Sequence, residues 1–249
     1  MTSFGDASLT ATNNWLQNVK SSGKFYCTSL LGTNETIQRG ANYCPDSWNV
    51  INTDYFGMYF TAEQANSTIE LSAVGVAPSI NLLYSNDLEN WSQIIPGTTT
   101  ITLSKIDDCI WIKAGENGNV TIASSDNDYH KFSMTGKIAA SGSIMSLLDG
   151  TNETYEISST FCFSHLFDGC SSLTQAPELP ATALASWCYS SLFKDCTSLT
   201  ATSPLPAATL ENYCYNEMFN GCSTLSIVNT TMSAFTPADA TTHWLSGVA

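Results

Sequence analysis

Apolar and polar residues alternate along seven short segments between residues 51 and 137, and this alternation predicts β-strands. The segments are residues 56–60, 68–72, 80–84, 99–103, 109–113, 120–122 and 130–134. Clusters of Gly, Asn, Asp and Ser separate them at intervals of about 8–12 residues, a spacing typical of a β-sandwich. The pattern therefore predicts an antiparallel β-sandwich over residues 51–137.

A second pattern, a 26-residue repeat, occupies residues 151–232. Each of its three copies has two cysteines at constant offsets, and these six residues are Cys162, Cys170, Cys188, Cys196, Cys214 and Cys222. A fixed period of about 20–29 residues, with Leu and Cys at regular offsets, is typical of a leucine-rich-repeat solenoid. The expected fold class is therefore mixed β and α/β: an antiparallel β-sandwich followed by a short solenoid of three repeats.

Within one repeat, the apolar spacing predicts a helix and a short strand. Leu184, Cys188 and Leu192 follow an i, i+4, i+8 spacing, which places them on one face of a helix over residues 183–193. Residues 173–179 are expected to form the strand. Each repeat should therefore contribute one strand and one helix to a common core.

The repeat cysteines are interpreted as reduced structural residues that stack in buried columns, since free cysteine behaves as a small apolar side chain. Disulfide frameworks dominate only in small secreted scaffolds. Cys27 and Cys44 flank a 16-residue loop, and the sequence leaves open whether they pair.

Two further segments flank the repeats. Residues 138–150 predict a bridging helix that ends at Gly150. Residues 233–249 are expected to cap the stack, because a solenoid needs a cap at its terminal repeat. The residues expected to form this lid are Trp244, Leu245 and Val248.

The N-terminal segment, residues 1–50, is expected to dock on another protein. Residues 12–19 predict a short amphipathic helix, and residues 241–248 repeat their form. The expected docking residues share one face and are Trp15, Leu16 and Val19. The predicted partner is a capsid protein or a neighbouring copy of the chain.

Aromatic residues flank the first cysteine of every repeat, which predicts one column packed between helices and one column that reaches solvent. The candidate ligand-binding or partner-binding residues are Phe163, Tyr189 and Tyr215, together with Trp91 on the β-sandwich. The alternative is that the rings only pack at the boundary of the core. A further alternative places a glycan site on the β-sandwich around Trp91 and Trp111.

Composition narrows the classes of partner. Only 12% of the residues are charged, and 22 acidic against 8 basic residues give a net charge of −14. This balance argues against nucleic acid, which needs a basic surface, and against an anionic membrane. No apolar stretch is long enough for a transmembrane helix, and the first residues lack the pattern of a secretory signal.

The sequence predicts no enzyme, no cofactor and no metal. The three histidines, His130, His165 and His243, do not lie at metal-ligand spacing, and no phosphate-binding loop or nucleophile elbow occurs. Cys162 and His165 are three residues apart, but the other two repeats keep the cysteine and lose the histidine. A carboxylate pair for glycoside cleavage stays open, because such pairs meet only in the folded chain.

Another variable position lies beside the expected strand. Gln175, Ala201 and Ile227 are equivalent residues of the three copies and differ in chemistry. Variable positions on a constant scaffold suit partner-specific contacts.

The repeats resemble the BspA-like leucine-rich repeats of Bacteroidales surface proteins and of the phages of those bacteria. The pattern MF-x-G-C-[ST]-S-L-T-x-A-P-x-L-P-A-T-x-L-x-x-x-C-Y matches over residues 166–189 and again over residues 192–215. It weakens after Leu225 and is missing before Ile157. The segments on the N-terminal side of the repeats resemble modules found beside such repeats.

The resemblance implies adhesion or host-surface recognition without catalysis. A secreted bacterial member would carry a signal peptide, whereas a phage structural protein made in the host cytoplasm needs none. We therefore expect a component of the virion surface, such as a head fibre, decoration protein or receptor-binding protein. It would contact a bacterial surface glycan or a capsid partner, or form a homo-oligomer. The alternatives are a leucine-rich-repeat adhesin on the bacterial cell surface and a glycan-binding β-sandwich module.

Overall fold

The computed structural model describes residues 24–27, 49–52, 57–150, 155–232 and 236–248, and the chain divides into two compact units at Tyr55. In the first unit, strands β1 (Lys24–Cys27) and β2 (Asn49–Asn52) pair in parallel. The helix expected over residues 12–19 lies outside the described residues. So do the expected docking residues and any Cys27–Cys44 pair, since the side chain of Cys27 is not described.

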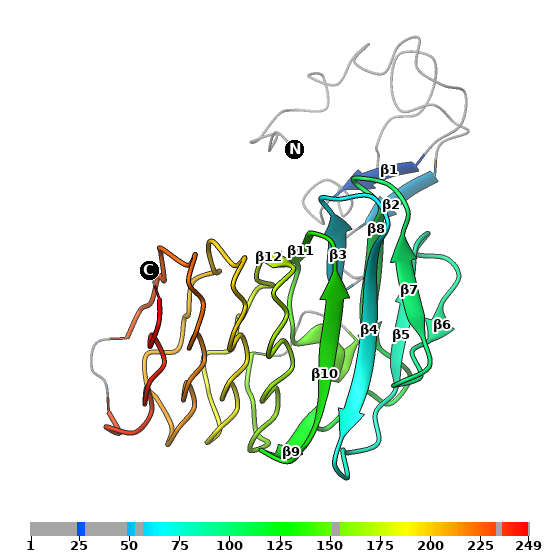
Figure 1. The fold of residues 1–249 in the computed structure, drawn as a ribbon. Helices are drawn as coiled ribbons and strands as arrows, with labels where there is room; N and C mark the ends of the chain where they lie inside the picture. The colour runs from blue at the N-terminus through cyan, green and yellow to red at the C-terminus, as the bar shows by residue number, and fades with distance from the viewer. Residues whose placement is uncertain (1–23, 28–48, 53–56, 151–154, 233–235, 249) are drawn as a thin grey trace, which may run out of the picture. The chain divides into compact units, whose positions relative to one another are not determined.

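The second unit is rich in β-structure and contains two sheets (Figure 1). The four-stranded sheet has the order β7-β4-β10-β9 and the six-stranded sheet has the order β12-β11-β3-β8-β5-β6. The strands are β3 (Met58–Ala62), β4 (Ser67–Val74), β5 (Leu82–Ser85), β6 (Ser92–Gln93), β7 (Thr100–Leu103), β8 (Cys109–Ala114), β9 (Ala123–Ser125), β10 (Asp128–Thr135), β11 (Ile138–Ser141) and β12 (Leu173–Gln175). All pairings are antiparallel except that of β11 with β12, which is parallel.

Alternation of apolar and polar residues accounts for most of these strands. Six of the seven expected segments overlap β3, β4, β5, β7, β8 and β10, whereas residues 120–122 are not a strand and β9 begins at Ala123. Buried and less buried residues alternate along β3 and β7, as a half-buried strand requires. The inward faces meet where Phe60 of β3 packs edge-to-face on Phe132 of β10, with ring centroids 5.4 Å apart.

The helix expected over residues 138–150 is only partly correct. Residues Ile138–Ser141 form strand β11, because Ile138 and Ala140 alternate with less buried residues and the strand pairs with both β3 and β12. Helix α2 (Ser146–Asp149) is one turn long and ends, as expected, at Gly150, whose φ is +73°. Glycine adopts this left-handed conformation without the steric cost that other residues meet.

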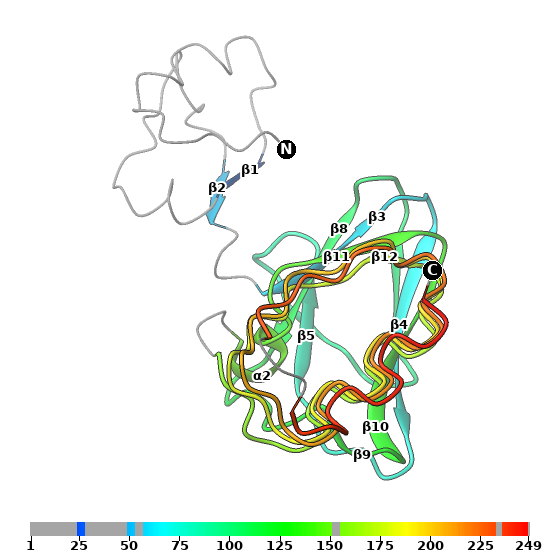
Figure 2. The same cartoon turned by 90° about the vertical axis from the view of Figure 1, so that its left-hand side faces the viewer.

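The three repeats wind as stacked coils, which we define as residues 155–180, 181–206 and 207–232. In the end-on view of Figure 2 these coils closely overlie one another. Parallel β-bridges join Gln175 to Ala201 and Ala201 to Ile227, so equivalent residues lie side by side on successive coils. The first coil continues the six-stranded sheet, because β12 belongs to it.

The helix expected over residues 183–193 is wrong, and a run of consecutive turns replaces it. Every fourth residue of this turn run has a left-handed backbone, with φ of +62° at Trp187, +53° at Ser191 and +57° at Asp195. A left-handed residue interrupts a right-handed helix before its first bonds can propagate. The i, i+4, i+8 spacing fits this four-residue period as well as it fits a helix.

Backbone N–H groups of the turn run alternate between two kinds of acceptor. The N–H of Leu192 donates to the carbonyl of Tyr189 within the turn, at 3.2 Å, and the N–H of Phe193 donates to Met218 of the next coil, at 2.9 Å. The same alternation runs through the equivalent residues 161–170 and 213–222. The turn run is therefore hydrogen-bonded along the stack much as a strand is within a sheet.

Residues 236–248 form a fourth, partial coil in the same register. Ala240 takes the buried place of Cys214, and the N–H of Tyr215 donates to its carbonyl at 2.8 Å. The ring of Trp244 stacks on Tyr215 at 6.1 Å, and Val248 also packs against the core. Of the three residues expected to form the lid, Leu245 departs from the prediction, because 40% of it is exposed.

One apolar core runs from the sheets into the coils. Phe132 of β10 stacks on Phe167 at 5.4 Å, Phe167 on Phe193 at 5.5 Å, and Phe193 on Phe219 at 5.7 Å. Backbone bonds follow the same path, since the N–H of Phe132 donates to Leu166 at 2.8 Å. The sheets therefore cover the first coil and supply its hydrogen-bonding partners.

We predict that Phe193→Ala lowers the free energy of unfolding by about 3–5 kcal/mol, because it opens a cavity in the middle of this ring column. Urea denaturation should show one transition for the second unit, shifted to lower denaturant. Ile106→Ala, at an exposed site, is the control and should change the free energy by less than about 0.5 kcal/mol. A coil transition that shifts while the sheets unfold as before would contradict the shared core.

Candidate partner-binding surface

Phe163, Tyr189 and Tyr215, the rings expected to contact a ligand, form a buried column. Their exposed fractions are 0%, 1% and 1%, and the rings stack at 5.9 Å and 6.0 Å. The expectation assumed a helix, in which the residue after each cysteine points about 100° away from it. In the turn run two adjacent residues of every four face the core, so each ring turns inward with its cysteine and packs there.

The column that reaches solvent consists of Phe161, Trp187 and Tyr213. These rings stack on one another at 5.4 Å and 4.1 Å with interplanar angles of 14° and 16°, and all three residues are half-buried. Their faces cover one another, so a partner would meet mainly their edges. Stacking of a sugar ring needs an open aromatic face, which this arrangement supplies poorly.

The two tryptophans of the β-region do not form one exposed surface. Trp111 is buried, at 6% exposed, and Trp91 is half-buried with the Nζ atom of Lys113 over its ring at 4.2 Å from the centroid. Partial burial lowers the pKa of Lys113. A glycan site that uses both indole faces is therefore not formed here.

The six repeat cysteines are buried free thiols. Three of them donate to backbone carbonyls along the stack: Cys170 Sγ lies 3.0 Å from the Phe132 oxygen, Cys196 Sγ 3.1 Å from that of Phe167, and Cys222 Sγ 3.0 Å from that of Phe193. Burial raises the pKa of Cys162, Cys170 and Cys222 to about 12 and that of Cys214 to about 11. Thiols with such pKa values stay protonated at neutral pH, and the protonated thiol is a poor nucleophile.

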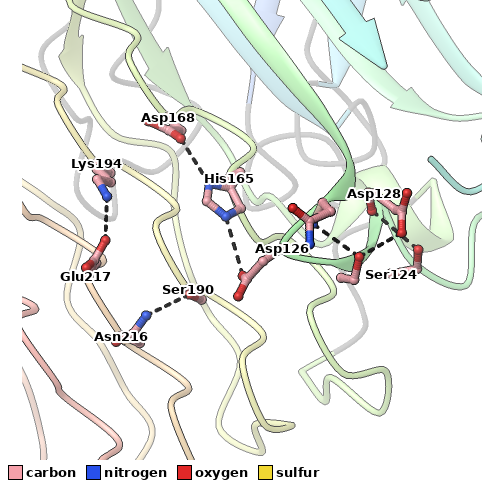
Figure 3. Close-up of polar contacts among 11 residues, drawn as sticks. Ser124, Asp126, Asp128, His165, Asp168, Ser190, Lys194, Asn216 and Glu217 are labelled. Carbon is pink, nitrogen blue, oxygen red and sulfur yellow. Dashed lines mark hydrogen bonds and ion pairs between the residues drawn. The ribbon is translucent and has the colours of Figure 1, made fainter. Parts of the chain in front are cut away.

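A polar cluster lies where the β9–β10 turn meets the first coil (Figure 3). His165 Nδ1 lies 2.9 Å from Asp168 Oδ2, and its Nε2 lies 3.5 Å from Asp126 Oδ1. The ring also stacks on Tyr129 at 4.4 Å. The cluster thus fastens the β9–β10 turn to the coil, while Cys162 lies inside the core and does not pair with this histidine.

The variable polar positions of the next two coils pair with each other. Lys194 Nζ lies 2.5 Å from Glu217 Oε2, and Asn216 Nδ2 donates to Ser190 Oγ at 3.2 Å (Figure 3). Both contacts join successive coils; the Lys194–Glu217 pair is partly exposed, whereas Ser190 is buried. Their chemistry differs from coil to coil, as the sequence comparison of the three copies indicates.

A groove of about 550 Å³ lies over the strand side of the three coils. Hydroxyl groups predominate in its lining, and one carboxylate, one ammonium, one amide and one methyl group complete it. The lining residues are Glu63, Lys137, Thr174, Gln175, Ser198, Thr200, Ala201, Thr202, Ser203 and Thr224. Gln175 and Ala201, two members of the variable column, thus lie in the groove, whereas Ile227 does not line it.

Threonine hydroxyls of this groove form a ladder along the stack. Thr174 Oγ1 donates to the carbonyl of Ile138 at 3.1 Å, and Thr200 Oγ1 donates to that of Thr174 at 3.2 Å. Each hydroxyl proton therefore points toward the preceding strand or coil, which fixes the oxygen in place and leaves its lone pairs as acceptors. The sequence signal for this ladder is the 26-residue spacing of Thr174 and Thr200, which the pattern of apolar positions does not reveal.

The hydroxyl of Tyr189 and that of Ser164 are buried without a hydrogen-bond partner among the residues described. An unpaired buried hydroxyl costs about 1–3 kcal/mol. We predict that Tyr189→Phe raises the free energy of unfolding by about 1 kcal/mol, since the change removes the unpaired group and Phe163 already fills the equivalent place. Tyr213→Phe, in the half-buried column, is the matched control for thermal denaturation and should leave stability nearly unchanged. A destabilised Tyr189→Phe variant would show that the hydroxyl has a partner after all.

Over the described parts of the chain, no group of three or more His, Cys, Asp or Glu residues is placed to hold a metal ion. The same residues contain no helix of the length and apolarity that crossing a bilayer requires. No protein-family model matches the chain, and neither a curated protein nor a solved structure matches it.

Proposed function

We propose that this chain is a non-enzymatic binding protein of the adhesion type, and that its groove holds a neutral carbohydrate. The observation that carries the proposal is the hydroxyl-lined groove over the strand side of the coils. Sugars offer rows of hydroxyl donors and acceptors, which match threonine oxygens and the amide of Gln175. The net charge of −14 disfavours anionic ligands at the same surface.

The ladder supports this proposal because its acceptors are already in place. Thr224 Oγ1, from a position two residues before the equivalent of Thr200, likewise donates to the preceding coil, to the carbonyls of Thr197 at 2.8 Å and Leu199 at 2.9 Å. A ligand that spans two coils would meet fixed oxygens and would not have to order them. Such preorganisation increases affinity, because less side-chain entropy is lost on binding.

We further propose that the coils are a short leucine-rich-repeat solenoid related to the BspA-like family. The 26-residue period, the parallel bridges through Gln175, Ala201 and Ile227, and the buried columns of Leu and Cys support this assignment. The turn run departs from the helix of the more familiar solenoids. A repeat of this length, with the same buried columns, can contain either a helix or a turn run on the side opposite the parallel bridges.

To test the groove, we predict that Gln175→Ala weakens binding to bacterial surface oligosaccharides about 3- to 10-fold, the effect of losing one or two neutral hydrogen bonds. A glycan array identifies the oligosaccharide, and calorimetry with the full chain measures its affinity. Ile227→Ala is the matched control, because Ile227 belongs to the same column but lies outside the groove lining. Equal losses in both variants, or an array without any bound glycan, would contradict the carbohydrate proposal.

We propose the surface of a phage virion as the setting of this protein, with a bacterial cell-surface adhesin as the alternative. The support is the resemblance of residues 166–189 and 192–215 to repeats found in both settings. Mass spectrometry of particles purified by density gradient should detect the chain at a constant ratio to the capsid protein. Its absence from particles, with recovery in the envelope fraction of the bacterium, would favour the adhesin.

A further inference from the structure

The fourth coil has an edge of unpaired backbone donors. At each of the three junctions between coils, alternate N–H groups of one turn run donate to the next coil, as Phe219 does to Trp244 at 2.9 Å. The equivalent donors of the last coil have no acceptor in residues 57–150, 155–232 or 236–248. They are the N–H groups of Thr241, His243, Leu245 and Gly247.

The other end of the stack is already covered. The N–H of Ile122 donates to the carbonyl of Cys162 at 2.9 Å, and that of Phe132 donates to Leu166 at 2.8 Å. Among residues 57–150, 155–232 and 236–248, the stack therefore has one open end, and the turn run at that end presents N–H donors. Two such ends cannot pair with each other, because N–H groups would face N–H groups.

The sequence of residues 11–19 has the features that a further turn run needs. Ala-Thr-Asn-Asn-Trp-Leu-Gln-Asn-Val shares five of nine residues with Ala-Thr-Thr-His-Trp-Leu-Ser-Gly-Val at residues 240–248. Asn14 and Asn18 fall on His243 and Gly247, where φ is +51° and +76°. Asparagine is one of the few residues that adopt this left-handed conformation readily.

We propose that residues 11–19 of a second copy of this chain dock on the open edge as an added coil. In the register of the three existing junctions, the four donors meet carbonyls two residues apart, and these belong to Ala11, Asn13, Trp15 and Gln17. Ala11 then continues the column of Cys214 and Ala240, and Val19 continues that of Val248. The contact is head-to-tail, so it joins copies into a ring or a filament.

The chemistry of the two surfaces is compatible with this contact. Neither residues 11–19 nor residues 240–248 contain Asp, Glu, Lys or Arg, so docking buries no unpaired charge of these types. The rest of the chain carries a large negative charge, and copies repel one another at long range. Screening by salt weakens this repulsion, and the association should therefore strengthen as ionic strength rises.

Sedimentation equilibrium of the full chain tests the proposal. Wild type should associate as its concentration rises, whereas Leu245→Glu, at the edge, and Asn14→Val, in the segment, should each lower the association constant at least about tenfold. An equimolar mixture of the two variants should form a one-to-one dimer, because one retains the segment and the other retains the edge. This complementation requires a contact between copies.

Two matched controls separate the contact from general effects on folding. Ile227→Glu adds the same charge at another exposed apolar site, and Asn13→Val places a β-branched residue where Thr242 stands in the existing coil. Both should associate like wild type, and so should Gln175→Ala, because the docking does not depend on the groove. A wild-type chain that stays monomeric, or variants that fail to complement each other, would overturn the proposal.

Discussion

The stack depends on a backbone that turns left-handed at every fourth residue. This geometry directs half of the N–H groups of a turn run along the stack and lets the other half close turns within the coil. A non-glycine residue with positive φ carries a steric cost, on the order of 1–2 kcal/mol. Trp187 and Tyr213, with φ of +62° and +55°, have this conformation where their rings stack on each other. The N–H of Trp187 donates to Asn212 of the next coil at 3.0 Å, and the carbonyl of Tyr213 accepts from Asn216 within the turn run at 3.0 Å. Strain of this kind persists only where the surroundings over-determine the conformation.

The left-handed residue at every fourth position also determines which side chains face the core. Because two adjacent residues of every four face the core, a cysteine and an aromatic residue enter together, as Cys188 and Tyr189 do. The small thiol leaves room for the ring beside it, and its burial keeps it protonated. On the opposite side of the coil, parallel bridges bring equivalent residues into line, and the hydroxyls of Thr174 and Thr200 become a ladder. The 26-residue repeat thus aligns both the buried side chains of the core and the hydroxyl groups of the groove.

Periodicity in the sequence was enough to predict the repeat and most strands. A period of two identifies a half-buried strand such as β3 or β7 wherever one face is solvated. Residues 183–193 could not be assigned by this reasoning, because apolar residues four apart fit a helix and a turn run equally. The distinguishing signal is the pair of adjacent apolar residues, as in Leu192 and Phe193, which a helix with a narrow apolar face does not need. Asp195 and its glycine equivalents at residues 169 and 221 mark the left-handed positions.

Predictions of which side chains reach the surface depended on whether they assumed a helix. Choosing the ring after each cysteine as the exposed one assumed a helix, and that error placed Phe163, Tyr189 and Tyr215 on the wrong side of the chain. The variable column of Gln175, Ala201 and Ile227 did not depend on that assumption, and its first two members line the groove. The groove itself needs Glu63 and Lys137 from the β-region, and no local sequence pattern connects them to residue 175.

The backbone bonds between coils follow one pattern at every junction, and this has a consequence for how the protein changes over generations. Inserting or deleting one whole 26-residue unit leaves every ring, thiol and hydroxyl facing its counterpart, so unequal recombination can lengthen or shorten the stack without redesigning its interior. Inserting a single residue inside a turn run instead shifts every later left-handed position by one and turns the buried pairs outward. Related proteins should therefore differ by whole coils and by surface substitutions. The number of coils then determines how far the stack extends from the sheets.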